Sequence, residues 1–375
     1  MKKIKVLSVF GTRPEAIKMC PLIKVLEESS EVESVVCLTG QHRQMLDQVI
    51  NIFGTKVHHD LNIMRPRQTL TTITTDIMTK MEEVLLNETP DLVLVHGDTS
   101  TSFVVALAAF YQQIPVGHVE AGLRTGDRYS PFPEEMNRVL SGHIAELHFA
   151  PTETSRQNLE REGICENVSV TGNTVIDSFA TTVKENYEFK DKKLRELDLV
   201  DKKIILMTAH RRENLGEPMR NIFKAVKRIA SGNPDVLVIY PVHLNPAVKE
   251  VAEEILDDVS GVALIDPIEV DDMHNLMAKS YLVLTDSGGL QEEAPSFGVP
   301  VLVMRTETER PEAVAAGTVK MAGVLEDDVY LLTNDLLNNE AEYTKMARAI
   351  NPYGDGHASE RILDAILKWR KKRGL

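Results

Sequence analysis

The chain of 375 residues carries 42 Lys and Arg residues against 56 Asp and Glu residues, which gives a formal net charge of -14. That length exceeds what one hydrophobic core usually organises, so we expect two domains. The acidic balance argues against nucleic acid or an anionic membrane as the main partner, because both bind concentrated basic surface.

The first half of the chain alternates apolar runs with helical segments. The run 4–10 predicts a strand that Gly11 ends, and Pro14 then stands where helices tolerate proline, in the first turn. Further strands are expected at 35–38, 92–96, 116–120, 145–150 and 168–171, and helices at 41–53, 69–87 and 100–112. This alternation predicts a parallel sheet with right-handed crossovers.

The same alternation restarts after a polar stretch at 185–203 that has few apolar residues. Strands are expected at 203–208, 236–240, 262–265, 281–285 and 299–304, and a helix at 217–230. We therefore predict a second parallel α/β domain and place the boundary near Gly172, so that the domains span 1–171 and 172–356. Residues 359–369 predict a last amphipathic helix, whose basic end suits the C-terminal helix dipole.

The three cysteines, Cys20, Cys37 and Cys165, are far apart and form no C-x-x-C pair. We interpret them as thiols in a reducing compartment. The first residues lack the long apolar core of a signal peptide, and no apolar run is long enough to span a bilayer. A cytoplasmic protein without a membrane partner is expected.

Acidic residues follow two apolar runs of the first half. Asp98 comes after the run 92–95, in the sequence His-Gly-Asp, and Glu120 comes after the run 115–117, in the sequence His-Val-Glu. The carboxyl ends of parallel strands meet at one edge of a sheet, so both acids are expected to face one crevice. Glu134 follows within a short loop. Acids clustered in a cleft favour proton chemistry.

A metal site is the alternative interpretation of the same stretches. His96 precedes Asp98 by two residues, as His118 precedes Glu120, and imidazole and carboxylate groups can share a cation. No H-E-x-x-H or other metal-ligand motif accompanies them. We therefore favour proton chemistry over a metallohydrolase and expect no metal cofactor.

The second half contains a candidate phosphate site. The strand at 281–285 leads towards Ser287, Gly288 and Gly289, and a helix is expected to start there. The free N–H groups of a helix start attract anions, and glycines let a phosphate approach the backbone. Glu293 would then be placed to accept hydrogen bonds from ribose hydroxyls. An ordinary tight turn is the alternative.

Basic residues follow several other strands. Arg13 stands at the start of the first helix, where its planar fork suits a diphosphate; the motif G-x-G-x-x-G is absent, so a nicotinamide cofactor is unsupported. His210 and Arg211 follow the strand at 203–208 and suit oxyanion binding, and Arg310 follows the last strand. Taken singly, each of these residues is also consistent with a solvated surface position.

Motifs along the whole chain together resemble the non-hydrolysing UDP-N-acetylglucosamine 2-epimerases. The matching stretches are GTRPEAIK, QHRQMLDQV, HGDTSTS, HVEAGLRT, SPFPEEMNR, VTGNTVID, TAHRREN, PVHLNP, LTDSGGLQEEAPSFGVPVLVMR, TERPEAV and NPYGDGHAS. The resemblance implies the GT-B architecture, in which two Rossmann-like domains enclose the active site and a last helix, here within residues 357–375, crosses back onto the first domain. It also implies a homodimer that uses neither a metal nor a nicotinamide.

The same resemblance implies a reversible epimerisation at C2 that interconverts UDP-N-acetylglucosamine and UDP-N-acetylmannosamine. The C2 proton is not acidic, so UDP would leave to give an enzyme-bound 2-acetamidoglucal and then add back. By resemblance, Asp98, Glu120 and Glu134 are the acid–base and ring-stabilising groups, and His210 stabilises the departing diphosphate. The implied UDP ligands are Arg13, Lys18, Ser287, Gly288, Gly289, Glu293 and Arg310.

A second, activating UDP-N-acetylglucosamine is implied by positions that match bacterial relatives. These positions are Gln41, Gln44, Arg67, Arg211 and His243. Two other enzymes are compatible with the sequence: a GT-B glycosyltransferase, which would transfer the sugar to an acceptor, and a hydrolysing 2-epimerase, which would release N-acetylmannosamine and UDP. A catalytically inactive UDP-sugar sensor is the non-enzymatic alternative.

Overall fold

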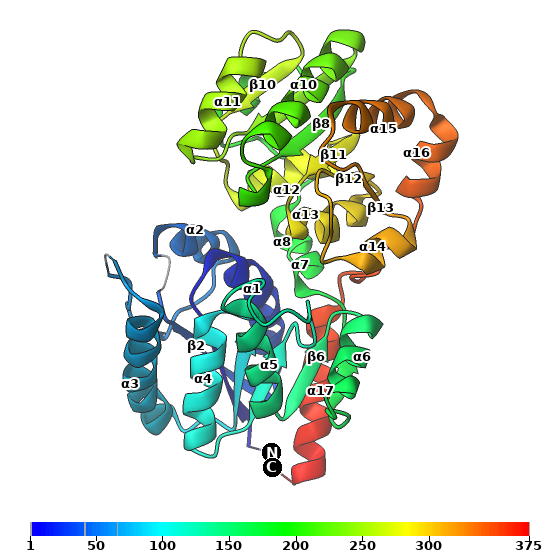
Figure 1. Cartoon of the computed structure of the whole chain (residues 1–375). Helices are drawn as coiled ribbons and strands as arrows, with labels where there is room; N and C mark the ends of the chain where they lie inside the picture. The colour runs from blue at the N-terminus through cyan, green and yellow to red at the C-terminus, as the bar shows by residue number, and fades with distance from the viewer. Residues whose placement is uncertain (1, 41–42, 66, 375) are drawn as a thin grey trace. The chain divides into compact units, whose positions relative to one another are not determined.

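The computed structural model describes residues 2–40, 43–65 and 67–374, without the side chains of residues 43–45. Contacts divide the chain into two compact units, each built on one parallel sheet (Figure 1). Unit 1 comprises Met1–Thr181 and Tyr353–Leu375, and unit 2 comprises Thr182–Pro352. The predicted pair of parallel α/β domains is confirmed.

Unit 1 contains a seven-stranded sheet. Its strands are β1 (Ile4–Phe10), β2 (Val32–Leu38), β3 (His59–Asp60), β4 (Leu92–His96), β5 (Val116–Val119), β6 (Leu147–Ala150) and β7 (Val168–Val170). Its helices are α1 (Arg13–Glu28), α2 (Arg43–Phe53), α3 (Leu70–Glu88), α4 (Ser100–Tyr111), α5 (Glu134–Ile144), α6 (Glu153–Arg161), α7 (Thr174–Asp177) and α17 (Ala358–Arg373), with α8 (Phe179–Thr182) at its border. The strand order is β3-β2-β1-β4-β5-β6-β7. Helices α3, α4 and α5 pack together, whereas α1 packs with α7 and α17.

Unit 2 contains a six-stranded sheet in the order β10-β9-β8-β11-β12-β13. The strands are β8 (Lys203–Thr208), β9 (Val236–Pro241), β10 (Val262–Ile265), β11 (Leu282–Thr285), β12 (Val301–Val303) and β13 (Val319–Met321). The helices are α9 (Lys192–Glu196), α10 (Glu217–Gly232), α11 (Pro246–Leu256), α12 (Val270–Ala278), α13 (Gly288–Glu293), α14 (Pro311–Ala316), α15 (Glu326–Asn338) and α16 (Glu340–Ala347), with short 3-10 turns at Arg212–Asn214 and Ala294–Phe297. In both units the sheet order reverses beside the first strand, β1 or β8, which is where open α/β sheets place ligands.

The apolar patterns explain these elements. All five residues of β4 are buried, as continuous apolar runs are when helices cover both faces of a parallel sheet. On α10, Met219, Ile222, Phe223 and Val226 recur at helical spacing and are buried in the core of unit 2. The strands β3 and β13, which span two and three residues, were not expected, because such short pieces carry no readable period.

The chain leaves unit 1 after Thr181, whereas the sequence analysis placed the boundary near Gly172. Asp177 accounts for the difference, because its carboxylate accepts hydrogen bonds from the N–H groups of Ala358 at 3.2 Å and Ser359 at 2.6 Å. These bonds fasten α7 to the start of α17, which packs against α1. The last helix therefore belongs to unit 1, although it follows unit 2 in the chain.

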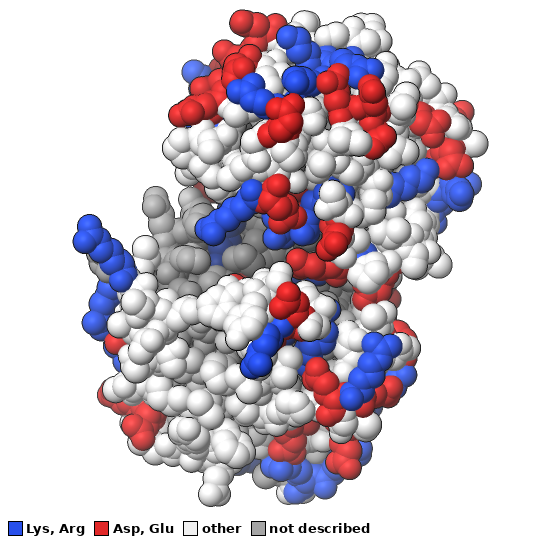
Figure 2. Space-filling view, in the orientation of Figure 1, with Lys and Arg blue, Asp and Glu red and all other residues white. Residues whose placement is uncertain are grey.

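The surface seen in Figure 2 carries Lys and Arg side chains interspersed with Asp and Glu side chains on each unit. This mixture is typical of solvated surface. Among the helices of the described ranges, none combines the length and the apolar character needed to cross a membrane.

Two histidines are buried side by side in the sheet of unit 1. His118 in β5 is paired with His148 in β6, and both are almost inaccessible to solvent. Burial lowers the pKa of His118 to about 3, although a hydrogen bond between its ring and the Gly97 carbonyl opposes the shift. Burial also lowers the pKa of His148 to about 4. Both rings are therefore neutral in the folded protein at neutral pH.

We predict that these rings make the protein acid-sensitive. Below the ordinary histidine pKa of 6.5 the unfolded chain binds protons at both positions, and the folded protein does so only near pH 3 to 4. The free energy of unfolding should therefore fall as the pH falls through this window. His118→Asn should make that slope shallower by roughly 1.4 kcal/mol per pH unit, the value of one proton.

Urea unfolding at a series of pH values measures this slope. Above pH 7.5 the unfolding free energies of the unsubstituted protein and of His118→Asn should depend on pH in parallel. In this range neither the folded nor the unfolded state binds a proton at His118. Equal slopes between pH 4.5 and 6 would show that His118 does not contribute.

Candidate functional site

Glu120 is held by side chains from three other parts of unit 1. It follows β5 with a backbone φ of 62°, in the left-handed region that non-glycine residues rarely adopt. Its Oε2 atom binds the Lys18 ammonium from α1 and accepts a hydrogen bond of 3.0 Å from Asn173 Nδ2. The Nε2 atom of His96, at the end of β4, lies 3.6 Å from the same oxygen. These contacts fix the carboxylate at the carboxyl edge of the sheet.

Two opposing effects determine the charge of Glu120. Burial by itself raises the pKa of this carboxyl group, but the Lys18 ammonium and His96 outweigh burial and hold the pKa well below its ordinary value. Glu120 is therefore a carboxylate at neutral pH, suited to accept a proton or to stabilise a positive charge. Lys18, which the sequence analysis placed among the UDP ligands, is the ion-pair partner of this acid in the structure.

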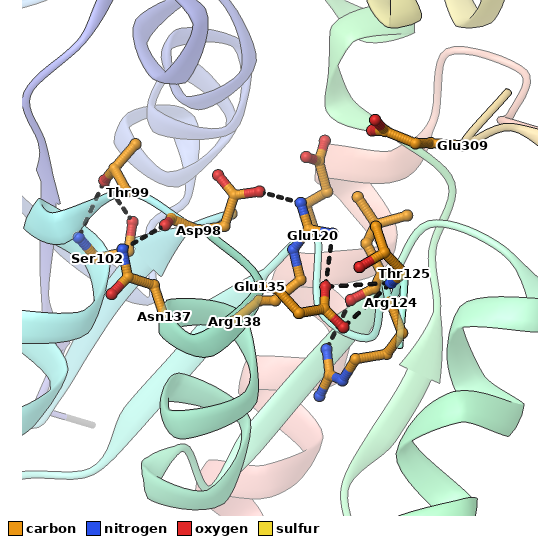
Figure 3. A network of polar contacts seen from close by, with 12 residues as sticks. Asp98, Thr99, Ser102, Glu120, Arg124, Thr125, Glu135, Asn137, Arg138 and Glu309 are labelled. Atoms are coloured by element: carbon orange, nitrogen blue, oxygen red, sulfur yellow. Dashed lines mark hydrogen bonds and ion pairs between the residues drawn. The ribbon is translucent and has the colours of Figure 1, made fainter. Parts of the chain in front are cut away.

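Asp98 follows β4 and is held by α5 (Figure 3). The Arg138 guanidinium binds Asp98 Oδ2 through Nη2, and Asn137 Nδ2 donates a hydrogen bond of 2.9 Å to the Asp98 carbonyl. The preceding residue, Gly97, is so near Glu120 that a Cβ atom there would lie 3.8 Å from Glu120 Oε1. The structure thus brings the loops of Asp98 and Glu120 together, as predicted from their strand ends.

Glu134 is the first residue of α5 and is half-buried. It precedes Arg138 by four residues, so the two side chains share one face of the helix. The segment before it contains two cis X-Pro bonds, at Pro131 and Pro133. Glu134 is therefore carried by the helix that holds Asp98.

Glu15 was not singled out from the sequence, yet it joins two loops of this region. Its Oε2 atom accepts hydrogen bonds from the N–H groups of Gly11 at 3.0 Å and Thr12 at 2.8 Å. Its Oε1 atom accepts hydrogen bonds from the hydroxyls of Thr99 at 2.7 Å and Ser102 at 3.2 Å. The loop that leads to Arg13 is thereby tied to the loop that carries Asp98. The capping-box spacing, a Thr followed three residues later by a Glu, was the available signal.

Gly11 shows how closely these loops approach. A Cβ atom at Gly11 would lie 1.9 Å from Thr39 Oγ1, which is in hydrogen-bond contact with Thr101 Oγ1 at 2.9 Å. Only glycine fits at this position. Arg13 follows two residues later as the first residue of α1.

In unit 2, the buried Asp286 organises the loop after β8. Its Oδ2 atom accepts hydrogen bonds from the N–H groups of His210 and Arg211, both at 2.8 Å, and from Asn214 Nδ2 at 3.2 Å. Its Oδ1 atom lies 3.2 Å from His210 Nδ1. Asp286 thus sets both the backbone and the ring of His210, a role that its position directly after β11 did not disclose.

The His210 ring stacks on His243, with ring centroids 5.5 Å apart and planes inclined by 14°. Burial lowers the pKa of His210; Asp286 opposes this effect, whereas His243 and Arg211 reinforce it. The ring is therefore a neutral hydrogen-bonding group at physiological pH rather than a fixed positive charge.

The glycines after β11 lie beside two guanidinium groups. A Cβ atom at Gly288 would be 3.8 Å from an Arg310 Nη2 atom and 4.0 Å from an Arg211 Nη2 atom. Arg310 is held by the buried Glu292, and its N–H donates to Thr308 Oγ1 at 3.1 Å. Because Gly288 has no side chain, there is space for a small anion between the backbone and the two arginines.

Glu293 lies on the same short helix and is positioned by His274. Its Oε2 atom lies 3.3 Å from His274 Nε2, whose Nδ1 atom is 2.8 Å from Thr182 Oγ1. A Cβ atom at Gly289 would come to 3.0 Å from Glu293 Oε1, so glycine also leaves room for this acid. His274 was not predicted, because its partners are distant in sequence.

The positions assigned to a second ligand are distributed over both units. Arg211 and His243 lie with His210 in unit 2. Arg67 is exposed in unit 1, before α3, with a φ of 59°. Gln41 and the side chain of Gln44 lie outside the described residues.

The alternative metal site can be compared with the observed contacts. The His118 ring is engaged with the Gly97 carbonyl at 2.7 Å. Within the described ranges, no group of three or more His, Cys, Asp and Glu side chains is placed to hold a metal ion.

Comparison with known proteins relates the chain to one family along nearly its whole length. The family model described as UDP-N-acetylglucosamine 2-epimerase matches residues 24–367. The UDP-N-acetylglucosamine 2-epimerase of Bacillus subtilis is 56% identical over 369 residues, which cover 98% of this chain and 96% of that protein. A Staphylococcus aureus MnaA structure with UDP is 51% identical, with a TM-score of 0.89 over 99% of this chain and 97% of that one. A Neisseria meningitidis UDP-GlcNAc 2-epimerase structure bound to UDP-GlcNAc is 49% identical, with a TM-score of 0.88 over 97% of this chain and 100% of that one.

We predict that Glu15 is essential for the stability of unit 1. Glu15→Ala would leave the N–H groups of Gly11 and Thr12 without their acceptor in a buried region, where Glu15 is 2% exposed. The expected loss is about 3 kcal/mol of unfolding free energy, measured by urea unfolding. Glu28→Ala, at the exposed end of the same helix, is the control and should change it by less than about 0.5 kcal/mol. Equal losses in both variants would contradict the prediction.

Proposed function

Because the chain belongs to the UDP-N-acetylglucosamine 2-epimerase family, we propose that it interconverts UDP-N-acetylglucosamine and UDP-N-acetylmannosamine without releasing the free sugar. The observation that carries the proposal is the pairing of Glu120 with Lys18 and of Asp98 with Arg138 at one sheet edge. Unit 2 supports it with glycine-lined space beside two arginines, which suits a diphosphate.

The reaction proposed is an elimination followed by an addition. The bond from C1 to the UDP oxygen breaks, a carboxylate takes the C2 proton, and a C1–C2 double bond forms in an enzyme-bound 2-acetamidoglucal. UDP then adds back to C1 while a carboxylic acid returns a proton to the other face of C2. Loss of UDP makes C1 electron-deficient, which acidifies the neighbouring C–H bond that no carbonyl activates.

Unit 1 would supply the groups that act on the sugar. Glu120 is suited to face the electron-deficient ring or to accept a proton, because Lys18 and His96 keep it ionised. The remaining acid–base candidates are Asp98, on the loop after β4, and Glu134, on α5. Arg138 of the same helix binds the Asp98 carboxylate. Lys18 would act through Glu120 rather than as a ligand of UDP.

Unit 2 would bind the nucleotide. Arg310 and Arg211, beside Gly288, provide fixed positive charge for the diphosphate. His210, whose Nδ1 atom faces Asp286, would have to carry a proton on Nε2 to donate a hydrogen bond as charge develops on the leaving oxygen. The remaining proposed nucleotide contacts are Arg13, Ser287, Gly289 and, for the ribose hydroxyls, Glu293.

Assembly and regulation are part of the proposal. The enzyme would act as a homodimer, with neither a metal nor a nicotinamide. A second UDP-N-acetylglucosamine would activate it through Arg211, His243, Arg67, Gln41 and Gln44. A hyperbolic rate curve in the direction from the manno epimer, with no need for added UDP-N-acetylglucosamine, would exclude that activation.

We predict that UDP-N-acetylglucosamine incubated with the protein in D2O will yield the manno epimer with deuterium at C2. Proton NMR follows both events, and a metal chelator should leave the rate unchanged. Asp98→Asn combined with Glu120→Gln should abolish both events, because no carboxylate pair then remains at that sheet edge.

Other outcomes identify other enzymes. Free N-acetylmannosamine and UDP as products would indicate hydrolysis, whereas sugar transfer with the C2 proton retained would indicate a glycosyltransferase. Turnover that survives the double substitution would contradict the assignment of these acids.

A further inference from the structure

The first turns of α5 carry, besides Glu134, polar side chains to which the proposed reaction gives no role of their own. Arg138 is one of them, and its side chain is only 9% exposed. It lies between two carboxylates, with Nη2 on Asp98 Oδ2 and Nη1 3.2 Å from Glu135 Oε2 (Figure 3). Asn137, one residue earlier, donates to the Asp98 carbonyl at 2.9 Å. Because Arg138 is buried and binds a carboxylate on each side, its guanidinium is held in one position.

We propose that Arg138 is a positioning residue for Asp98, holding this carboxylate in one orientation for proton transfer, with Glu135 as its anchor. The proposal rests on the proposed function, because it assigns Asp98 a proton-transfer task. Arg138 itself does not touch the reacting atoms.

The anchor is rigid because Glu135 is fastened to the backbone. Its carboxylate accepts hydrogen bonds from the N–H group of Thr125 at 3.1 Å and of Gly126 at 2.9 Å. Glu135 is 3% exposed and therefore has little freedom to move. An arginine fork held at one nitrogen by such a group presents its other nitrogen in a fixed direction, which a flexible lysine would not do.

The orientation of the Asp98 carboxylate follows from the contact at its Oδ2 atom. Arg138 engages Asp98 Oδ2, and Asn137 restrains the backbone of the same residue. Rotation of the Asp98 carboxylate is thereby blocked, and Oδ1 keeps one direction. Proton transfer requires this kind of restraint, because catalytic groups must be held to within roughly 0.5 Å of their productive geometry.

Charge is the second contribution of Arg138. Its guanidinium places a fixed positive charge beside the Asp98 carboxylate. The neighbouring candidate acid, Glu120, has its own cation in Lys18. Each of the two acids at this sheet edge is therefore paired with a fixed cation, which offsets the repulsion between them.

The helix adds a third effect. Glu134 precedes Arg138 by four residues on α5, so both lie on one face. The same rigid turn therefore carries one candidate acid and holds the other. The distance between Asp98 and Glu134 is set by α5 rather than by two independent loops.

The experiment compares Arg138→Met and Arg138→Lys with a matched control, Arg124→Met. The Arg124 side chain is also 9% exposed, and its guanidinium binds Glu162 and the Leu123 carbonyl instead. Epimerisation rates and C2 deuterium incorporation are measured from pH 5 to 9, UDP binding by calorimetry, and folding by thermal unfolding.

Arg138→Met should lower kcat roughly a hundredfold, with KM and UDP affinity changed less than about threefold, because orientation rather than binding is lost. Arg138→Lys, which keeps the charge without the fork, should restore part of kcat. Arg124→Met should follow the unsubstituted protein in both respects.

Several results would overturn the proposal. They are full activity of Arg138→Met, a loss no larger than that of Arg124→Met, or a lower kcat accompanied by an equally large loss of UDP affinity. If Arg138→Met does not fold, Arg138→Lys decides, because an unchanged kcat in that variant contradicts the need for the fork. An unsubstituted protein that exchanges no C2 proton would refute the proposed function itself, and this outcome is seen before any variant is compared.

Discussion

A buried carboxylate needs hydrogen-bond donors or a cation, and this requirement shapes the site region of both units. An isolated charge taken out of water costs several kcal/mol, so each such acid must gather partners from its surroundings. Glu15 collects two N–H groups and two hydroxyls, Glu120 an ammonium and an amide, and Asp286 two N–H groups and an amide. These partners come from loops distant in sequence, so satisfying the acid also fixes the loops.

In both units, acids that bind groups from several loops lie at the carboxyl edge of the sheet. In unit 1, Glu15 and Glu120 tie together the loops after β1, β4 and β5. In unit 2, Asp286 ties the loop after β11 to the loop after β8. Loops at the carboxyl ends of parallel strands are otherwise the least restrained part of an α/β unit, because no ladder hydrogen bonds hold them. The acids therefore make this edge rigid enough for chemistry, while the strands below supply stability.

The sequence predicted what depends on local pattern and missed what depends on distant partners. Apolar runs followed by Asp98 and Glu120 were sufficient to place both acids at one sheet edge, because strand ends converge there. The contact of Lys18 with Glu120 was not predicted, since nothing in the local sequence discloses that the two residues meet. Arg138 was overlooked for the same reason: the atoms that it binds belong to a loop after another strand. The observed boundary follows Thr181 rather than Gly172, because α7 is hydrogen-bonded to α17, a helix from the far end of the chain.

The distribution of fixed and adjustable charge has a chemical consequence. The cations are lysine and arginine, which keep their charge throughout the physiological range. They lie beside Asp98, beside Glu120 and beside Gly288, where the diphosphate is proposed to bind. His210 differs, since burial lowers its pKa and keeps it neutral. In the proposed reaction, a ring that can take up a proton would strengthen its hydrogen bond as negative charge grows on the leaving oxygen. In that reaction, a permanent cation at the position of His210 would stabilise the intact substrate and the departing nucleotide to a similar extent. It would therefore accelerate cleavage of the C1–oxygen bond less. In the proposed reaction, permanent charge would thus serve binding and orientation, and the titratable ring would serve the step in which charge moves.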